Sequence, residues 1–177
     1  MGEKKDFYGK AKEQMRLSER ILAAIPGFRG YKEKELRRES DKLIRKHLHG
    51  RLSQARDSLK AVSQRLSDRR WFDELKEMDR LVAKLDRLES RIEHASYGYA
   101  GFFDVIKVKE PNLDEMISFD NMLIDDVNGV VDDAASFQDT DLKESKDVKA
   151  CIQQLVKKLE ELEKTFDKRG EVILGVS

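Results

Sequence analysis

The sequence is poor in the residues that mark secreted and membrane-spanning proteins. Its 177 residues include one cysteine, Cys151, which excludes an internal disulfide and favours a reducing compartment, so we expect a cytoplasmic protein. No apolar run approaches the roughly 20 residues that a membrane span needs, and the N-terminal segment has no apolar stretch of signal-peptide length. Only two prolines, Pro26 and Pro111, interrupt the chain, which leaves room for long helices.

Familiar catalytic and metal-binding patterns are also missing. The chain has no Cys-x-x-Cys, His-Glu-x-x-His, Gly-x-Ser-x-Gly or phosphate-binding glycine-lysine motif. None of the three histidines completes the Glu-x-x-His pair of a di-iron bundle, and His47 and His49 would point to different faces of a helix. We therefore expect no catalytic residue, metal site, cofactor or small-molecule substrate, and hence no enzyme.

Two carboxylates keep a catalytic alternative open. Asp104 and Asp120 are candidates for buried acids, and Asp120 lies on the apolar side of a predicted helix. A hydrogen bond between Asp120 and an arginine of the basic half of the chain explains this position better than catalysis. Likewise, Cys151 lies among apolar positions, which favours a core thiol over a nucleophile.

Charge is what the chain has in abundance. Lys, Arg, Asp and Glu make up 40% of the residues, with 35 basic and 35 acidic side chains and zero net charge. Residues 1–100 carry 25 Lys/Arg and 17 Asp/Glu, whereas residues 101–177 carry 10 and 18, giving balances of +8 and −8. Such a chain can fold one half onto the other or pair with a second copy.

Apolar side chains recur at helical spacing along most of the chain, which predicts a single all-α domain over residues 1–177. We expect about five helices in an elongated antiparallel bundle. The first covers Lys4–Ile25, with Met15 and Leu22 on its apolar face. The second covers Lys32–Leu66, and the third continues to about residue 95. The fourth begins at Leu113, and the last runs from Val148 to the stop signal Lys168-Arg169-Gly170.

The second and third helices form a predicted coiled-coil-like hairpin. Leu48, Leu52, Ala55, Leu59, Val62 and Leu66 are spaced alternately by four and three residues, and this row continues through Gly50. The apolar phase slips after Leu66, where Ser67 and Asp68 could cap a new helix. One uninterrupted helix to residue 95 remains the alternative.

Two connections complete the predicted fold. Residues 132–147 are expected to form an acidic connection before the last helix. Val105–Val108 and Val172–Val176 are rich in β-branched residues, which favours a small two-stranded β attachment to the bundle.

Two aromatic and glycine-rich segments supply the candidate partner-binding residues. Pro26, Gly27 and Gly30 predict a corner after the first helix, and the segment 97–103 predicts a loop that meets it in an apolar cap. Together with arginines of the corner and the second helix, the candidates are Phe28, Arg29, Tyr31, Arg37, Arg38, Tyr97, Tyr99, Phe102 and Phe103.

The segments IPGFRGYKEKELRRESDK and GYAGFFD, over about residues 20–125, resemble an uncharacterised prokaryotic family of small helical proteins. The resemblance implies a shared helical fold and a cytoplasmic setting. It carries no activity and no site residues.

The expected function is therefore that of a non-catalytic helical interaction or scaffold protein. It would associate with itself or bind a protein partner through charged faces and the aromatic cap. The alternative is association with a membrane surface or nucleic acid through the basic segment 29–70, which holds 14 Lys/Arg and six Asp/Glu. Nucleic acid is disfavoured, because Glu33–Arg37 and Asp41–Arg45 have the spacing of pairs within one helix and acids of segment 110–147 can neutralise much of the rest.

Overall fold

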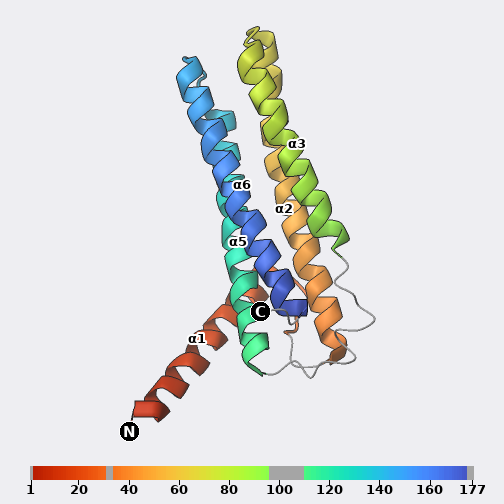
Figure 1. The fold of residues 1–177 in the computed structure, drawn as a ribbon, viewed down its shortest axis with the longest axis vertical. Coiled ribbons are helices and arrows are strands. Elements are labelled where there is room, and N and C mark those ends of the chain that lie inside the picture. Colours follow the sequence, from red (N-terminus) through yellow and green to blue (C-terminus); the bar gives the residue numbers. More distant parts are fainter. Residues whose placement is uncertain (1, 31–33, 96–109, 175–177) are drawn as a thin grey trace. The chain divides into compact units, whose positions relative to one another are not determined.

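The computed structural model describes residues 2–30, 34–95 and 110–174, and every regular element in these ranges is an α-helix (Figure 1). The helices are α1 (Gly2–Ala24), α2 (Lys34–Asp68), α3 (Phe72–His94), α5 (Glu110–Asp139) and α6 (Ser145–Leu174). The all-helical prediction is thereby confirmed for the described residues, and the segment 31–95 contains two helices rather than one.

A tight turn ends α1. The amide of Phe28 donates to the carbonyl of Ile25 at 3.2 Å, with Pro26 and Gly27 between them. Gly27 has a φ of +86°, and proline followed by a glycine of positive φ is the pattern of a type II turn. Three residues on, Gly30 also has a positive φ, and its carbonyl accepts a 2.9 Å hydrogen bond from Ser40 Oγ of α2. The predicted corner is confirmed at these residues.

The turn between α2 and α3 is a Schellman motif with an arginine in the glycine position. The amide of Trp71 donates to Leu66 O at 3.0 Å, and the amide of Arg70 donates to Ser67 O at 2.9 Å. Arg70 has a φ of +59°, a left-handed conformation that glycine adopts most easily. The prediction that Ser67 and Asp68 cap α3 is wrong, because they end α2 and Trp71 holds the N-cap position without a side-chain cap bond.

The C-terminal part of the chain is more helical than its sequence indicates. Helix α5 continues to Asp139, so only residues 140–144 remain of the predicted acidic connection. The predicted stop at Gly170 is wrong, since α6 runs to Leu174. Residues 172–174 are therefore helical and not part of a strand, and the segment 105–108 lies outside the described residues.

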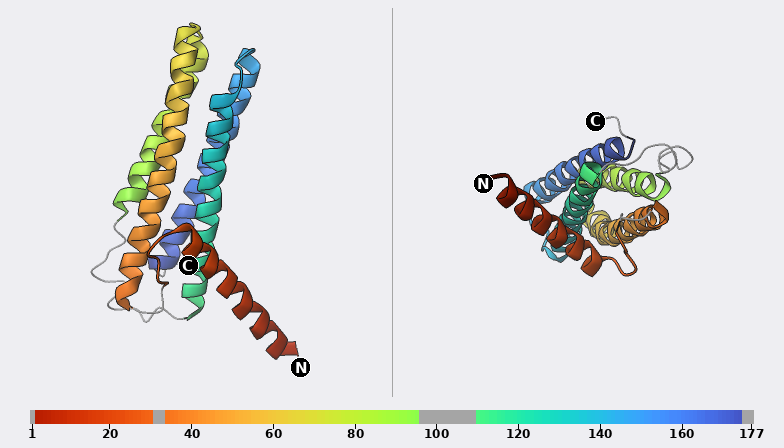
Figure 2. Two further views of the ribbon diagram at one scale, coloured as in Figure 1. Left: turned by 180° about the vertical axis from the view of Figure 1, so that it is seen from behind. Right: turned by 90° about the horizontal axis from the view of Figure 1, so that it is seen from below.

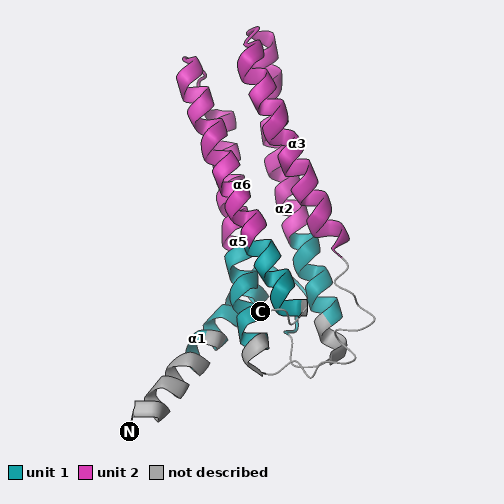
Figure 3. Ribbon diagram, viewed as in Figure 1, with its two compact units in different colours: residues 1–47, 96–123, 165–177 teal, residues 48–95, 124–164 magenta. Residues whose placement is uncertain are grey.

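The chain divides into two compact units, which Figure 3 distinguishes. Unit 2, residues 48–95 and 124–164, is a four-helix arrangement in which α2 lies beside α3 and α5 beside α6 (Figures 1 and 2). Side-chain contacts connect each of the four helices to two others. They join Arg56 to Glu89 (α2–α3), Lys84 to Glu160 (α3–α6), Lys158 to Asp133 (α6–α5) and Arg51 to Asn128 (α5–α2). Its core contains the predicted row of α2, all of whose members are buried: Leu48, Leu52, Ala55, Leu59, Val62 and Leu66.

Unit 1 comprises residues 1–47, 96–123 and 165–177. It contains α1 and the flanking ends of α2, α5 and α6. Among its described residues, Ile21, Ile25, Phe28, Ile44 and Met116 are buried apolar side chains, and Asp41, Asp120 and Arg169 are buried charged ones. Apolar burial supplies the main favourable free energy of both units, whereas the buried charges of unit 1 demand a specific geometry.

Candidate interaction surface and buried ionic cluster

Large apolar side chains are exposed mainly in unit 1. Met15 and Leu22 of α1 are 63% and 50% exposed, and Met122 of α5 is 46% exposed. The fourth exposed large apolar side chain of the described residues is Phe72 of unit 2, at 65%. Met15 and Leu22 are seven residues apart and therefore lie on the same face of α1. The two residues share a face as predicted, but this face is not buried at either of them.

Helix α1 is attached to α5 by its other side. Asn121, which is buried, donates from Nδ2 to the carbonyl of Leu17 at 3.1 Å and to the carbonyl of Ile117 at 2.9 Å. Ile21 is fully buried on the same helix. Because α1 uses Leu17 and Ile21 for packing, the row of Met15 and Leu22 is left to solvent. We name Met15 and Leu22 the apolar patch.

The structure places three of the sequence-predicted partner-binding residues. Phe28 is buried at 4% exposure, so it is a core residue of unit 1, while Arg29 and Arg38 are exposed. Arg37 belongs to α2, and its side chain is not described. The remaining candidates, Tyr31, Tyr97, Tyr99, Phe102 and Phe103, lie outside the described residues, as does the proposed meeting of the corner with the aromatic loop. The exposed members of the apolar patch were not among the candidates.

A buried ionic cluster joins three helices of unit 1. Arg169 Nε of α6 donates to Asp120 Oδ1 of α5 at 2.6 Å, and Arg169 Nη1 lies 2.8 Å from Asp41 Oδ1 of α2. Arg45 Nε donates to Asp41 Oδ2 at 2.9 Å. Two guanidinium groups thus face two carboxylates, which balances the charge where water is excluded. The expected arginine partner of Asp120 exists, but it comes from the acidic half of the chain and not from the basic half.

Arg169 belongs to the predicted stop signal Lys168-Arg169-Gly170, whose basic composition did not indicate a buried side chain. A signal was present, since Arg169 follows Phe166 by three residues and precedes Ile173 by four, in phase with the apolar row of α6. Asp120 and Asp41 likewise lie in phase with the apolar rows of their helices. A charged residue in a seam position predicts a buried pair, provided that the helix extends far enough to include it.

Histidine and carboxylate groups approach each other between α2 and α3. Buried Glu89 accepts a 2.9 Å hydrogen bond from Arg56 Nη1, and His49 Nδ1 lies 3.4 Å from Glu89 Oε1 and 3.9 Å from Glu93 Oε2. Within the described residues, no group of three or more His, Cys, Asp or Glu side chains is arranged to hold a metal ion. The contacts of Glu89 with Arg56 and His49 connect α3 to α2.

Several arginines of the basic segment bind groups of the protein itself. Besides Arg45 and Arg56, Arg51 Nε donates to Asn128 Oδ1 at 3.2 Å, and Arg65 donates to the carbonyls of Gln138 and Thr140. Arg69 donates to the carbonyl of Leu142. These carbonyls lie at and beyond the C-terminal end of α5, where a helix leaves acceptors unsatisfied. The basic character of segment 29–70 is thus partly a structural requirement of the fold.

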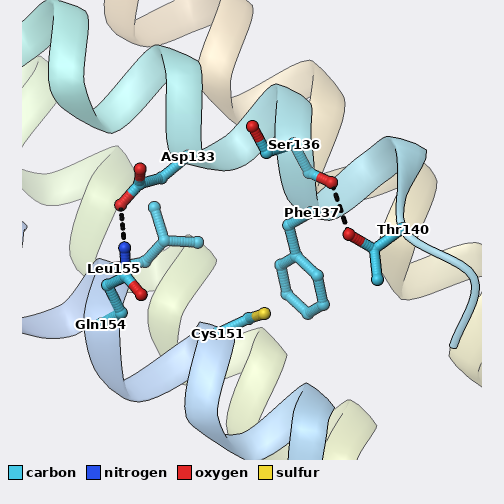
Figure 4. Close-up of a pocket in the computed structure, with 7 residues that line it drawn as sticks. All are labelled: Asp133, Ser136, Phe137, Thr140, Cys151, Gln154 and Leu155. Carbon is cyan, nitrogen blue, oxygen red and sulfur yellow. Dashed lines mark hydrogen bonds between the residues drawn. The ribbon is translucent and has the colours of Figure 1, made fainter. Parts of the chain in front are cut away.

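A small pocket lies between α5 and α6 of unit 2, beside Cys151 (Figure 4). Its volume is about 130 Å³, well below the several hundred Å³ of typical ligand sites. Asp133 Oδ2 in its wall accepts from Gln154 Nε2 at 2.8 Å and lies 2.7 Å from Lys158 Nζ. Burial, followed by the negative charges of Asp147 and Asp133, raises the pKa of the Cys151 thiol. Such a thiol is a poor nucleophile at neutral pH.

No protein-family model, curated protein or solved structure matches this chain. The resemblance of residues 20–125 to a prokaryotic helical family therefore remains a prediction. None of the helices, over the residues that the structure describes, is long and apolar enough to cross a bilayer.

Proposed function

We propose that this protein is a non-catalytic helical interaction protein that binds a protein partner through the apolar patch of unit 1. The observation that carries the proposal is the exposure of Met15 and Leu22, which lie seven residues apart on one face of α1, while the Asn121–Leu17 hydrogen bond attaches this helix to α5. Large apolar side chains that are exposed together on one face mark interaction sites. Methionine suits such a site because its flexible side chain adapts to the surface of a partner.

The charges around the patch are of both signs. Lys12, Arg16 and Glu19 are exposed on α1 beside Met15. A partner helix with an apolar row bordered by charges of both signs would match this surface, because interfaces combine an apolar centre with a polar rim. The parts of α2, α5 and α6 that belong to unit 1 would act as the scaffold that holds α1 in place.

The state of the carboxylates supports binding over catalysis. Asp120 and Asp41 are 0% and 1% exposed and each faces a guanidinium group, so neither reaches a substrate from solvent. Asp104, the other candidate acid, lies outside the described residues. The burial of Asp120 and Asp41 is explained by their ion pairs with arginines, which hold the helices of unit 1 together.

Affinity purification from cell extract followed by mass spectrometry tests the proposal. The wild-type chain and the control Phe72→Lys, which alters an equally exposed apolar residue of unit 2, should recover the same partner. Met15→Lys combined with Leu22→Lys should lose it, because two charges then occupy the centre of the contact. The purified partner should bind the double variant at least ten-fold more weakly in a titration. Equal recovery or equal affinity for all three chains would disprove a role for the patch.

A further inference from the structure

Two exposed charges of opposite sign border the apolar patch on the same side of α1. Lys12 and Glu19 are seven residues apart, which separates them by about 10.5 Å along the helix axis. Met15 lies between them, three residues after Lys12 and four before Glu19. Because each residue turns the helix by about 100°, Lys12 and Glu19 lie about 60° and about 40° from Met15, both in the same direction around the helix.

This spacing matches a second α1 that runs in the opposite direction. Two antiparallel helices related by a two-fold axis bring the same side of each helix together, and each residue faces the one that lies equally far beyond the axis. With the axis beside Met15, Lys12 of each copy faces Glu19 of the other, and the two Met15 side chains meet at the centre. Arg16 lies about 100° from Met15 around the helix, which is outside the contact.

Other ways of pairing two α1 helices lack this match. An axis midway between Met15 and Leu22 would bring Glu19 of one copy against Glu19 of the other, and like charges repel. In a parallel pair, the side of one helix that carries Lys12 and Glu19 would meet the other side of its neighbour, so these charges would not pair. Only the antiparallel arrangement centred at Met15 therefore gives the patch both an apolar centre and a complementary rim.

We propose that α1 of one copy binds α1 of a second copy in this antiparallel arrangement. Met15 and Leu22 supply the apolar centre, and Lys12 with Glu19 supplies two ion pairs related by the symmetry axis. The contact uses the same surface of both copies, so it closes as a dimer and does not grow further. The opposite side of each α1 stays attached to its own α5. The inference rests on the proposed function, because it names the partner of the same patch.

Sedimentation equilibrium of the full chain tests the inference by exchange of charges. Small interfaces bind weakly and their ion pairs are screened by salt, so the protein is measured at on the order of 0.1 mM in about 20 mM NaCl. The wild type should then have twice the 20.5 kDa mass of the monomer. Lys12→Glu alone and Glu19→Lys alone should each raise the dissociation constant about ten-fold, because each places like charges in both symmetry-related contacts.

The two changes together distinguish this contact from a general charge effect. Lys12→Glu combined with Glu19→Lys should restore the dissociation constant of the wild type, because the same pairs form with their signs exchanged. Lys60→Glu is the matched control, since it makes the same change in net charge as Lys12→Glu at an exposed position of α2. This control should dimerise like the wild type.

Oxidation of single-cysteine variants tests the position of the axis. In a Cys151→Ser background, Met15→Cys should form a disulfide between copies, because the two equivalent positions lie beside the axis. Leu22→Cys should stay reduced, because its two equivalents lie about 20 Å apart along the helices. Electrophoresis without reductant measures the linked fraction, and equal linkage of both variants would overturn the arrangement.

Two further results would overturn the inference: a wild type that remains monomeric, or a combined exchange of Lys12 and Glu19 that binds no more tightly than the single changes. A monomeric wild type that still captures a different protein through Met15 and Leu22 would leave the proposed function intact. The proposed function itself fails only if Met15→Lys with Leu22→Lys recovers every partner, a second copy included, as well as the wild type does.

Discussion

Arg169 Nε lies 2.6 Å from Asp120 Oδ1, and both side chains are completely buried. The two residues are 49 positions apart, on α6 and α5, and Asp41 of α2 completes the contact. Replacing one member of a buried pair is costly because its partner keeps a charge that water cannot reach. The first prediction follows from this geometry.

Arg169→Met should lower the free energy of unfolding by about 3–5 kcal/mol, since it leaves Asp120 and Asp41 buried beside the single remaining charge of Arg45. Urea denaturation followed by circular dichroism measures the change. Lys168→Met is the matched control, because Lys168 is the adjacent exposed residue of the same helix. If both variants unfold within about 0.5 kcal/mol of each other, the cluster does not stabilise unit 1.

Arg70→Gly should stabilise the protein by about 1 kcal/mol, because glycine adopts the positive φ of the Schellman position without the Cβ clash that arginine suffers. Arg70→Ala separates the backbone effect from loss of the side chain, since alanine keeps the clash. Thermal or urea unfolding of the three chains gives the comparison. A glycine variant no more stable than the alanine variant would contradict the assignment of this turn.

Ser145→Ala should weaken the contact between α3 and α6 in a pH-dependent way. The hydroxyl of Ser145 donates to Glu74 Oε1, and this hydrogen bond is the main cause that lowers the pKa of Glu74 from 4.5, with its backbone amide and Lys149 adding to it. A carboxyl whose pKa is lower in the folded state stabilises that state above the unfolded pKa and loses this contribution as the pH falls through the folded pKa.

The difference in unfolding free energy between wild type and Ser145→Ala should therefore be present at pH 7 and shrink below pH 4.5. NMR titration of Glu74 should show a higher pKa in the variant. In Glu74→Gln, which has no carboxyl to titrate at this position, the effect of Ser145→Ala should not vary over this pH range. A constant difference from pH 7 to pH 3 in the Glu74 background would count against the charged hydrogen bond.

Cys151 should react slowly with iodoacetamide at pH 7.4, because its raised pKa leaves little thiolate at that pH. The rate in the folded protein should be several-fold below that in urea, where the thiol is exposed and its pKa is ordinary. Asp147→Asn should speed the reaction of the folded protein, since it removes one of the negative charges that oppose ionisation. Equal rates for the folded and unfolded chains would refute the shift.

The helices and most of the core could be predicted because the apolar rows are long and regular. The row from Leu48 to Leu66 is buried throughout, including the stretch across Gly50, whose Cβ position has no neighbour within 4 Å. The proline and glycines of the corner also predict where α1 ends. Local chemistry determines these features, so one sequence suffices to find them.

The ends of α6 and the exposed side of α1 could not be predicted, because both depend on tertiary contacts. Lys168-Arg169-Gly170 has the composition of a helix stop, yet the burial of Arg169 against Asp120 carries α6 onward to Leu174. Met15 and Leu22 fit an apolar face, but the hydrogen bond from Asn121 to Leu17 attaches α1 to α5 by the opposite side of the helix. Contacts between residues far apart in the sequence therefore determine both the end of α6 and the exposed side of α1.

The ionic cluster also limits how the helices of unit 1 can slide along one another. Apolar rows repeat every seven residues, so a displacement by one repeat still matches apolar side chains with apolar side chains. Moving one helix by one such repeat shifts its charged group by about 10.5 Å, which separates Arg169 from Asp120 or Asp41. A slipped bundle would then contain solitary buried ions, whose cost is far larger than any loss of apolar packing. The cluster thus fixes the axial register of the helices, because only one of the registers that the apolar rows permit pairs all the buried charges.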